Sequence, residues 1–245
     1  MRQRSGVFGE AVGEYESARA GYPPELVADV LAMAPAGPVL EVGAGTGKAS
    51  VAFAARGVDL TCVEPDPRMA RQLAGHCPGA RIEVTSFEDY LPDRAYALVF
   101  SAQAWHWVAP ERRSELALAA LAPGGVLALF WNRYILADPE LRERLKEIDD
   151  RFGIASSLHH APEDFLGDPL LAGEAGFRDA AHRLYRREER YPAARYLDLI
   201  RSVSAYRMLE SGELEELLGL VAAEIGSGVD LVLVTQLDVA RKEEA

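Results

Sequence analysis

The sequence has few cysteines and no uninterrupted hydrophobic run long enough for a membrane helix. Its two cysteines, Cys62 and Cys77, lack the spacing of a metal site, and Cys62 sits in a strand-like segment where a buried free thiol is expected. The longest apolar stretch, residues 116–131, is interrupted by a Pro-Gly-Gly sequence. No basic segment followed by an apolar one opens the chain. We therefore expect a soluble, cytoplasmic protein.

Basic residues are also scarce relative to acidic ones. The chain has 26 Lys and Arg against 38 Asp and Glu, which gives a formal net charge of -12. Such a charge repels polyanions at long range. Nucleic acid and membrane surfaces are therefore not expected as partners, and the absence of internal repeats argues against a solenoid. The oligomeric state cannot be derived from these features.

Short apolar runs alternate with amphipathic segments over much of the chain. The runs at 38–43, 59–64, 81–85, 96–102 and 126–131 predict strands. Helical spacing occurs at 47–57 and 67–77, and a third helix from residue 111 is predicted to close at Pro123 and Gly124. This alternation is typical of a parallel sheet with helices on both faces. Ligands of such sheets bind beyond the carboxyl ends of the strands.

Further elements flank this region. Helices are expected at 23–35 and 138–153, a strand near 178–191, two helices within 192–225 and a closing strand at 230–239. The fold class is thus α/β, with a doubly wound, mostly parallel sheet of seven strands. We expect a single domain, 1–245, made of an N-terminal cap (1–37), a cofactor-binding core (38–132), a helical lid insert (133–176) and C-terminal strands and helices (177–245).

Three kinds of ligand compete for the glycine-rich loop in "VLEVGAGTGKAS", residues 39–50. A phosphate-binding P-loop would need a glycine where Val42 stands and a hydroxyl where Ala49 stands. A dinucleotide fingerprint would need its third glycine one position later, where Lys48 stands. S-adenosylmethionine has no phosphate and carries two positive groups, so acids near the loop favour it.

Two acids follow strand ends beside this loop. Glu41 lies two residues before Gly43, and Glu64 comes twenty-one residues after Gly43, at the end of the next strand. A carboxylate at the second position can accept hydrogen bonds from both hydroxyls of a ribose. Glu64 alone also fits NAD, and a tight turn with two solvated acids remains the alternative without a ligand.

Five segments in this order resemble the successive motifs of the class I S-adenosylmethionine-dependent methyltransferases of the small-molecule type. They are "VLEVGAGTG", "VEPDPRMARQL", "SFEDYLP", "YALVFSAQAWHWV" and "LAPGGVLALFWN". The late "RSVSAYRML" resembles the acceptor-side helix of the methyltransferase type 11, trans-aconitate-methyltransferase-like branch. The resemblance implies a Rossmann-like methyltransferase fold and S-adenosylmethionine as the cofactor.

The resemblance also implies which residues hold the cofactor. The glycine loop would wrap its methionine part, Glu64 would bind the ribose, and the segment at 86–88 would lie near the adenine, although many relatives have Asp where Ser86 stands. The implied cofactor-binding residues are Arg19, Glu41, Gly43, Ala44, Gly45, Glu64, Pro65, Met69, Ser86, Phe87, Glu88, Ser101 and Ala102.

Candidates for the chemistry follow the fourth predicted strand. Methyl transfer needs alignment in a dry pocket, and a base only if the nucleophile must lose a proton. His106 is the candidate base, with packing against the next helix as the alternative. Candidate substrate-binding residues are Tyr15, Trp105, His159, His160, Ser204 and Tyr206. Solvent-exposed positions are the alternative for the histidine pair and the late helix, and no metal site is expected.

These features predict methyl transfer from S-adenosylmethionine to a small organic acceptor. Oxygen is the first expectation for the acceptor atom, with nitrogen or sulfur possible. The rival is a protein of the same fold that binds S-adenosylmethionine without transferring the methyl group, and an NAD-linked oxidoreductase is more distant. Specificity lies in segments without a motif, so the acceptor cannot be named from the sequence.

Overall fold

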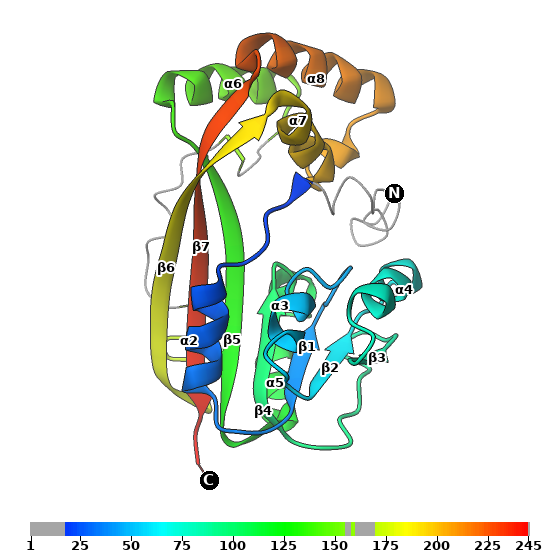
Figure 1. The fold of residues 1–245 in the computed structure, drawn as a ribbon, viewed down its shortest axis with the longest axis vertical. Coiled ribbons are helices and arrows are strands. Elements are labelled where there is room, and N and C mark those ends of the chain that lie inside the picture. Colours follow the sequence, from blue (N-terminus) through cyan, green and yellow to red (C-terminus); the bar gives the residue numbers. More distant parts are fainter. Residues whose placement is uncertain (1–17, 155–157, 160–169, 245) are drawn as a thin grey trace. The chain divides into compact units, whose positions relative to one another are not determined.

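The computed structural model describes residues 18–154, 158–159 and 170–244 (Figure 1). Seven strands form one sheet in the order β3-β2-β1-β4-β5-β7-β6. They are β1 (Val39–Val42), β2 (Leu60–Val63), β3 (Arg81–Glu83), β4 (Tyr96–Ala102), β5 (Leu121–Leu136), β6 (Phe177–Pro192) and β7 (Gly228–Lys242). The pairs from β3 to β5 are parallel. β7 runs opposite to β5 in Figure 1, so the sheet is mixed, and the predicted seven-stranded α/β fold is confirmed.

Of the described helices, one precedes the first strand, and the others lie between strands in the chain. They are α2 (Pro24–Met33), α3 (Ser50–Ala54), α4 (Pro67–His76), α5 (Arg113–Ala120), α6 (Pro139–Arg151), α7 (Ala193–Ser202) and α8 (Ser211–Ile225), with short 3-10 helices η3 (Trp105–Trp107) and η5 (Tyr206–Met208). Several begin at a residue whose side chain satisfies free backbone amides. Asp66 accepts from the Arg68 amide before α4, and Asp138 accepts from the Glu140 amide before α6.

The end of α5 differs from the sequence-based expectation. The helix stops at Ala120, and Leu121 already pairs with Tyr96 as part of β5. Pro123 has no amide hydrogen to continue the helix, and Gly124 adopts a φ of 69°. The predicted closure at these two residues was therefore wrong by one turn.

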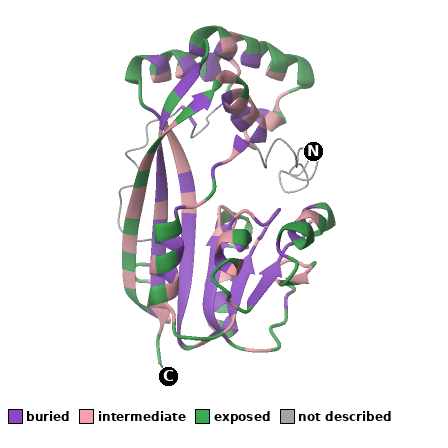
Figure 2. Cartoon of the chain, in the orientation of Figure 1, coloured by how far each residue is buried: buried purple, intermediate pink, exposed green. Residues whose placement is uncertain are grey.

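Hydrophobic residues cover both faces of the sheet because neighbouring strand residues point to opposite sides. On one face Phe100 of β4 packs with Phe53 of α3 and with residues of α2, whereas Val99 packs on the other face with Ala117 of α5. Figure 2 shows the resulting run of buried residues along the short strands. This arrangement is the doubly wound one.

The chain forms two compact units. The sheet unit contains, among the described residues, 21–132, 170–185 and 235–244. The helical unit contains 18–20, 133–154, 158–159 and 186–234, so β5, β6 and β7 have residues in both. The predicted single domain with a lid at 133–176 stays a prediction.

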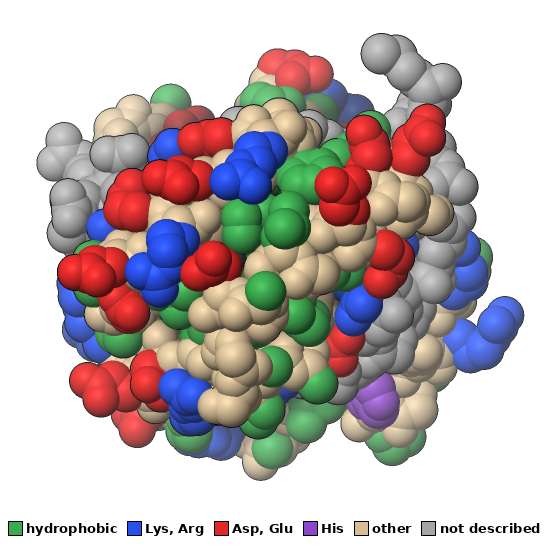
Figure 3. Space-filling model, turned by 90° about the horizontal axis from the view of Figure 1, so that it is seen from above, with side chains coloured by type: hydrophobic (Ala, Val, Ile, Leu, Met, Phe, Trp, Pro, Cys, Tyr) green, Lys and Arg blue, Asp and Glu red, His purple; other side chains and the backbone are tan. Residues whose placement is uncertain are grey.

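The helical unit has a core of its own. Buried side chains of α6, α7 and α8 pack together, including Leu145, Leu199 and Val221. Acidic and basic side chains mix across the face shown in Figure 3. Arg144 of α6 pairs with Glu224 of α8 at 2.8 Å. None of the helices in the described part of the chain has the length and hydropathy needed to span a membrane.

Candidate active site

The glycine loop between β1 and α3 contains backbone conformations that glycine adopts without strain. Gly43 has a φ of 70° and Gly45 a φ of 58°. A Cβ atom on Gly43 would overlap the Ala104 side chain, whereas a Cβ on Gly45 would meet no atom within 4 Å. The loop therefore packs closely against the segment after β4 at Gly43 and has open space at Gly45.

Glu64 holds this loop at the end of β2. Its Oε2 accepts from the Gly45 amide at 2.8 Å, and its Oε1 accepts from the Asp66 amide at 2.9 Å. Only 5% of the residue is exposed, and this burial raises the pKa of the carboxyl, while the two amide hydrogen bonds lower it. Each carboxylate oxygen has a second lone pair, so both can accept a further hydrogen bond from a ligand.

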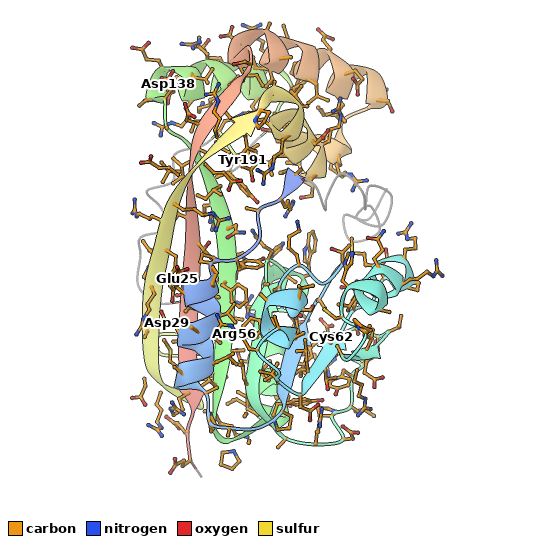
Figure 4. The ribbon with its side chains drawn as sticks, viewed as in Figure 1. Glu25, Asp29, Arg56, Cys62, Asp138 and Tyr191 are labelled. Atoms are coloured by element: carbon orange, nitrogen blue, oxygen red, sulfur yellow. The ribbon has the colours of Figure 1, made fainter. Side chains whose placement is uncertain are left out.

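Glu41 on β1 is buried more completely, at 1% exposure. Ser50 of α3 donates a 2.5 Å hydrogen bond to its Oε2, and the thiol of Cys62, labelled in Figure 4 on β2, lies 3.8 Å from the same atom. Burial raises the pKa of Glu41 to about 8, with opposing contributions from the Ser50 and Cys62 hydrogen bonds, which lower it, and a smaller one from the nearby Glu64, which raises it. At neutral pH and without a bound cation, Glu41 is therefore mostly protonated.

The residues after β4 lie at the carboxyl end of the sheet. Ser101 is fully buried and donates to the Val42 carbonyl at 2.9 Å, and Ala102 is half-buried. Trp105 is buried and its ring lies 6.1 Å from that of Phe87. His106 is exposed, with its ring 4.8 Å from Trp107.

The other predicted cofactor residues of the sheet unit differ in exposure. Pro65 is exposed and Met69 is buried. Ser86 donates to Asp89 at 2.8 Å in a local turn, and the Glu88 carboxylate accepts from the Ala109 amide at 2.8 Å. Ala44 is buried within the glycine loop. Glu88 therefore also supports the segment before α5.

Two candidate residues of the helical unit belong to a buried polar cluster, which we call the Asp149 cluster: Asp149, His159, Tyr196 and Tyr206. His159 Nδ1 lies 2.7 Å from Asp149 Oδ2, and its Nε2 lies 2.9 Å from the Tyr196 hydroxyl. Tyr206 donates to the same Asp149 oxygen at 2.9 Å. Neither candidate is solvent-exposed, so the exposed alternative is wrong for His159 and Tyr206.

The remaining candidates of this unit have separate positions. Arg19 donates to the Ser202 carbonyl at 2.9 Å and to its hydroxyl at 3.2 Å. Ser204 is half-buried. Tyr15 and His160 lie outside the described residues. The roles predicted for all these residues stay predictions.

Several residues of the two regions had no signal in the sequence. Gln103 has a φ of 60° directly after β4, and the buried Asn132 accepts from Thr235 at 2.6 Å. Asp149 and Tyr196 lie in sequence segments that predict amphipathic helices, and nothing in those segments distinguishes them from their neighbours. Asp149 lies in α6, the helix that precedes the histidine pair, so a search for acidic residues in that helix could have found it. No sequence pattern predicts the positive φ of Gln103.

Comparisons with known proteins find similarity to methyltransferases. Residues 39–125 match the family model described as a methyltransferase domain. An uncharacterised methyltransferase of Mycobacterium tuberculosis is 42% identical over 132 residues, which are 54% of this chain and 54% of that protein. The chain thus matches about half the length of this curated relative.

Two other similarities extend further along the chain. An uncharacterised methyltransferase of Schizosaccharomyces pombe is 26% identical over 216 residues, 86% of this chain and 83% of that protein. A solved structure from Anaeromyxobacter dehalogenans, assigned there to a type II methyltransferase, has a TM-score of 0.67 at 23% identity and covers 93% of this chain and 99% of that one. The structural likeness supports the fold.

Proposed function

We propose that this chain, a member of the class I S-adenosylmethionine-dependent methyltransferases, transfers a methyl group from S-adenosylmethionine to a small organic acceptor and releases S-adenosylhomocysteine. The acceptor atom we propose is oxygen first, with nitrogen or sulfur as the other outcomes of the test. The observation that carries the proposal is the Glu64 carboxylate, which holds the Gly45 amide at the carboxyl end of the sheet.

The site's chemistry fits this cofactor better than a nucleotide phosphate. Two acids, Glu41 and Glu64, lie next to the loop, and a phosphate there would meet negative charge or an unionised carboxyl. The open space at Gly45 leaves room for a ligand against the loop backbone. The free lone pairs of Glu64 suit two ribose hydroxyls.

Bound S-adenosylmethionine would supply an electrophilic methyl group on a sulfonium leaving group. The protein's part is then to bind and orient the two reactants and to exclude water. Glu64 and the glycine loop would hold the nucleoside side, while Glu41 would lose its proton when a cationic group binds nearby, because a positive charge stabilises the carboxylate. Ser101, through the Val42 carbonyl, keeps the ends of β1 and β4 together.

Calorimetry and thermal unfolding test the cofactor. S-adenosylmethionine and S-adenosylhomocysteine should bind and raise the melting temperature, whereas NAD and ATP should not. Glu64→Ala should weaken binding by about 1–3 kcal/mol, because hydroxyl groups lose a charged acceptor. Glu83→Ala, which removes the same charge at the end of β3, is the control. Tight NAD binding without a response to either adenosyl ligand would refute the proposal.

Turnover separates the enzyme from a protein that binds the cofactor without reacting. Purified protein should form S-adenosylhomocysteine in the presence of the small-molecule fraction of a cell lysate, and mass spectrometry of the methylated product would name the acceptor. Cofactor binding without any product would favour the non-catalytic rival. We also predict activity after exhaustive chelation, since no group of three or more metal-ligating side chains occurs among the described residues.

The role of His106 as a base is part of the proposal. A neutral imidazole is needed, so kcat/KM should fall as pH drops through roughly 6 to 7. His106→Ala should lower kcat/KM by about 10²–10⁴-fold and leave cofactor affinity nearly unchanged. His76→Ala, which removes a ring that contacts the Thr46 carbonyl, is the matched control. If His106→Ala keeps the full rate with a weakly acidic alcohol or phenol as acceptor, His106 is not the base. If the variant binds the cofactor more weakly, His106 is a packing residue.

A further inference from the structure

Gln103 has a backbone conformation that residues other than glycine rarely adopt. Its φ is 60°, and among the described non-glycine residues it shares a positive φ only with Asp179. Such a conformation is energetically unfavourable and persists only where the surroundings hold it. Asp179 is on an exposed part of β6, whereas Gln103 directly follows β4. The position of Gln103 therefore calls for an explanation.

Hydrogen bonds to β5 keep Gln103 in place. Its backbone amide donates to the Phe130 carbonyl at 3.0 Å, and its side-chain Nε2 donates to the Asn132 carbonyl at 3.0 Å. Asn132 is itself fixed, since Thr235 of β7 donates to its Oδ1 at 2.6 Å. The carboxamide of Gln103 is thus oriented by a supported strand end.

This turn lies at the place where the strand order reverses. β1 and β4 are neighbours in the sheet, and the chain continues from β1 to one side and from β4 to the other. Ligands of open α/β sheets bind at this switch point. Ala104, the next residue, lies so close to Gly43 that a Cβ there would overlap it. Gln103 is therefore next to the residue that meets the proposed cofactor loop.

The carboxamide oxygen of Gln103 remains available. Because a carbonyl can only accept, Nε2 must face Asn132, and Oε1 is the other atom of the same group. No hydrogen bond reaches Oε1 from the described residues, and it keeps access to solvent. A strained backbone thus presents an unpaired acceptor at the switch point.

We propose that Oε1 of Gln103 contacts the methyl-bearing sulfonium end of bound S-adenosylmethionine and makes the protein prefer the methyl donor to the product. This inference rests on the proposed function. A carboxamide oxygen carries partial negative charge, which attracts a sulfonium and the polarised C–H bonds of its methyl group. S-adenosylhomocysteine has a neutral thioether and no methyl group there, so it gains less from the same oxygen.

Calorimetry with both ligands on the full chain tests the proposal without turnover. Gln103→Met keeps the length of the side chain and removes the carboxamide. It should weaken S-adenosylmethionine binding about 3- to 10-fold and change S-adenosylhomocysteine binding less than 2-fold. Gln103→Asn, whose side chain tolerates a positive φ but is one carbon shorter, should shift the ratio of the two affinities in the same direction.

Asp179→Asn is the control, because it changes the side chain of the other described non-glycine residue with a positive φ and leaves Gln103 and its hydrogen-bond partners intact. It should leave the ratio of the two affinities unchanged. An unchanged ratio in both Gln103 variants, or equal weakening of both ligands, would overturn the proposal and leave Gln103 as a support of the strand end. A wild-type protein that binds neither ligand would instead refute the proposed function itself.

Discussion

Two buried carboxyl groups, one in each unit, differ in the side chains that hydrogen-bond to them. Glu41 in the sheet unit has a hydroxyl and a thiol as hydrogen-bond partners among the described residues. Asp149 in the helical unit has a histidine and a tyrosine hydroxyl. Burial beside a hydroxyl and a thiol raises the pKa of Glu41, whereas the Asp149 carboxyl contacts an imidazole and a phenol hydroxyl.

The difference matters for function. The protonated Glu41 can change its charge when a cation binds, because its hydrogen-bond partners among the described residues, Ser50 and Cys62, are neutral. The side chains of the Asp149 cluster hydrogen-bond with one another, and Asp149 Oδ1 has no hydrogen-bond partner among the described residues. We expect the first region to respond to ligands and the second to maintain the packing of α6, α7 and η5.

The largest expected effect is at the Asp149 cluster. His159→Leu leaves the Asp149 carboxyl buried without its imidazole partner and should lower the free energy of unfolding by about 3–5 kcal/mol in urea titrations. His182→Leu is the matched control, because its partner Asp238 also accepts from the Leu170 amide at 2.9 Å. Similar losses in the two variants would contradict the special role of His159.

A smaller effect is expected at the glycine loop. Gly43→Ala combines a positive φ with overlap against Ala104 and should lower the free energy of unfolding by about 2–4 kcal/mol. Gly45→Ala has the same backbone cost but open space, so it should cost only about 1 kcal/mol. Chemical denaturation without ligand measures both, and equal losses would show that the overlap is relieved by a shift of the loop.

The smallest effect is the pH dependence due to Glu41. Its pKa is raised from 4.5 to about 8, so between these values the native state holds a proton that the unfolded state has lost. Stability from this proton is complete below about pH 4.5 and is lost as pH rises toward 8. From pH 5.5 to 7 the loss should be about 2 kcal/mol.

Glu41→Gln removes this titration. Urea unfolding across pH 5.5 to 7 should therefore show a flatter slope for the variant than for the wild-type protein. Equal slopes would mean that Glu41 is ionised in the folded protein at neutral pH, and the comparison with Asp149 would fail.

Local patterns predicted most of the elements because strand and helix periods depend on neighbouring residues. The apolar runs predicted at 38–43, 59–64 and 96–102 became β1, β2 and β4. The end of α5 was predicted less well, since the pairing of Leu121 with Tyr96 depends on a strand 25 positions earlier in the chain. Long-range pairing decides such boundaries.

Candidate site residues could be predicted from the sequence where their spacing along the chain is typical of a ligand-binding motif. Gly43, Gly45 and Glu64 were named from their spacing, and the structure brings Gly45 and Glu64 into hydrogen-bond contact. His159 was placed in a loop, with solvent exposure as one alternative, and it is fully buried. Its partner Tyr196 is 37 positions away, a separation that no local pattern reveals.

The sequence by itself determined the alternation of strands and helices, the loop that requires glycine, and the acids at two strand ends. Only the tertiary structure decided that Glu41 keeps its proton, that His159 is enclosed, and that Gln103 adopts a strained turn. Periodicity and spacing are properties of adjacent residues. Burial, dielectric environment and enforced backbone conformation arise from segments that are distant in the chain and meet only on folding.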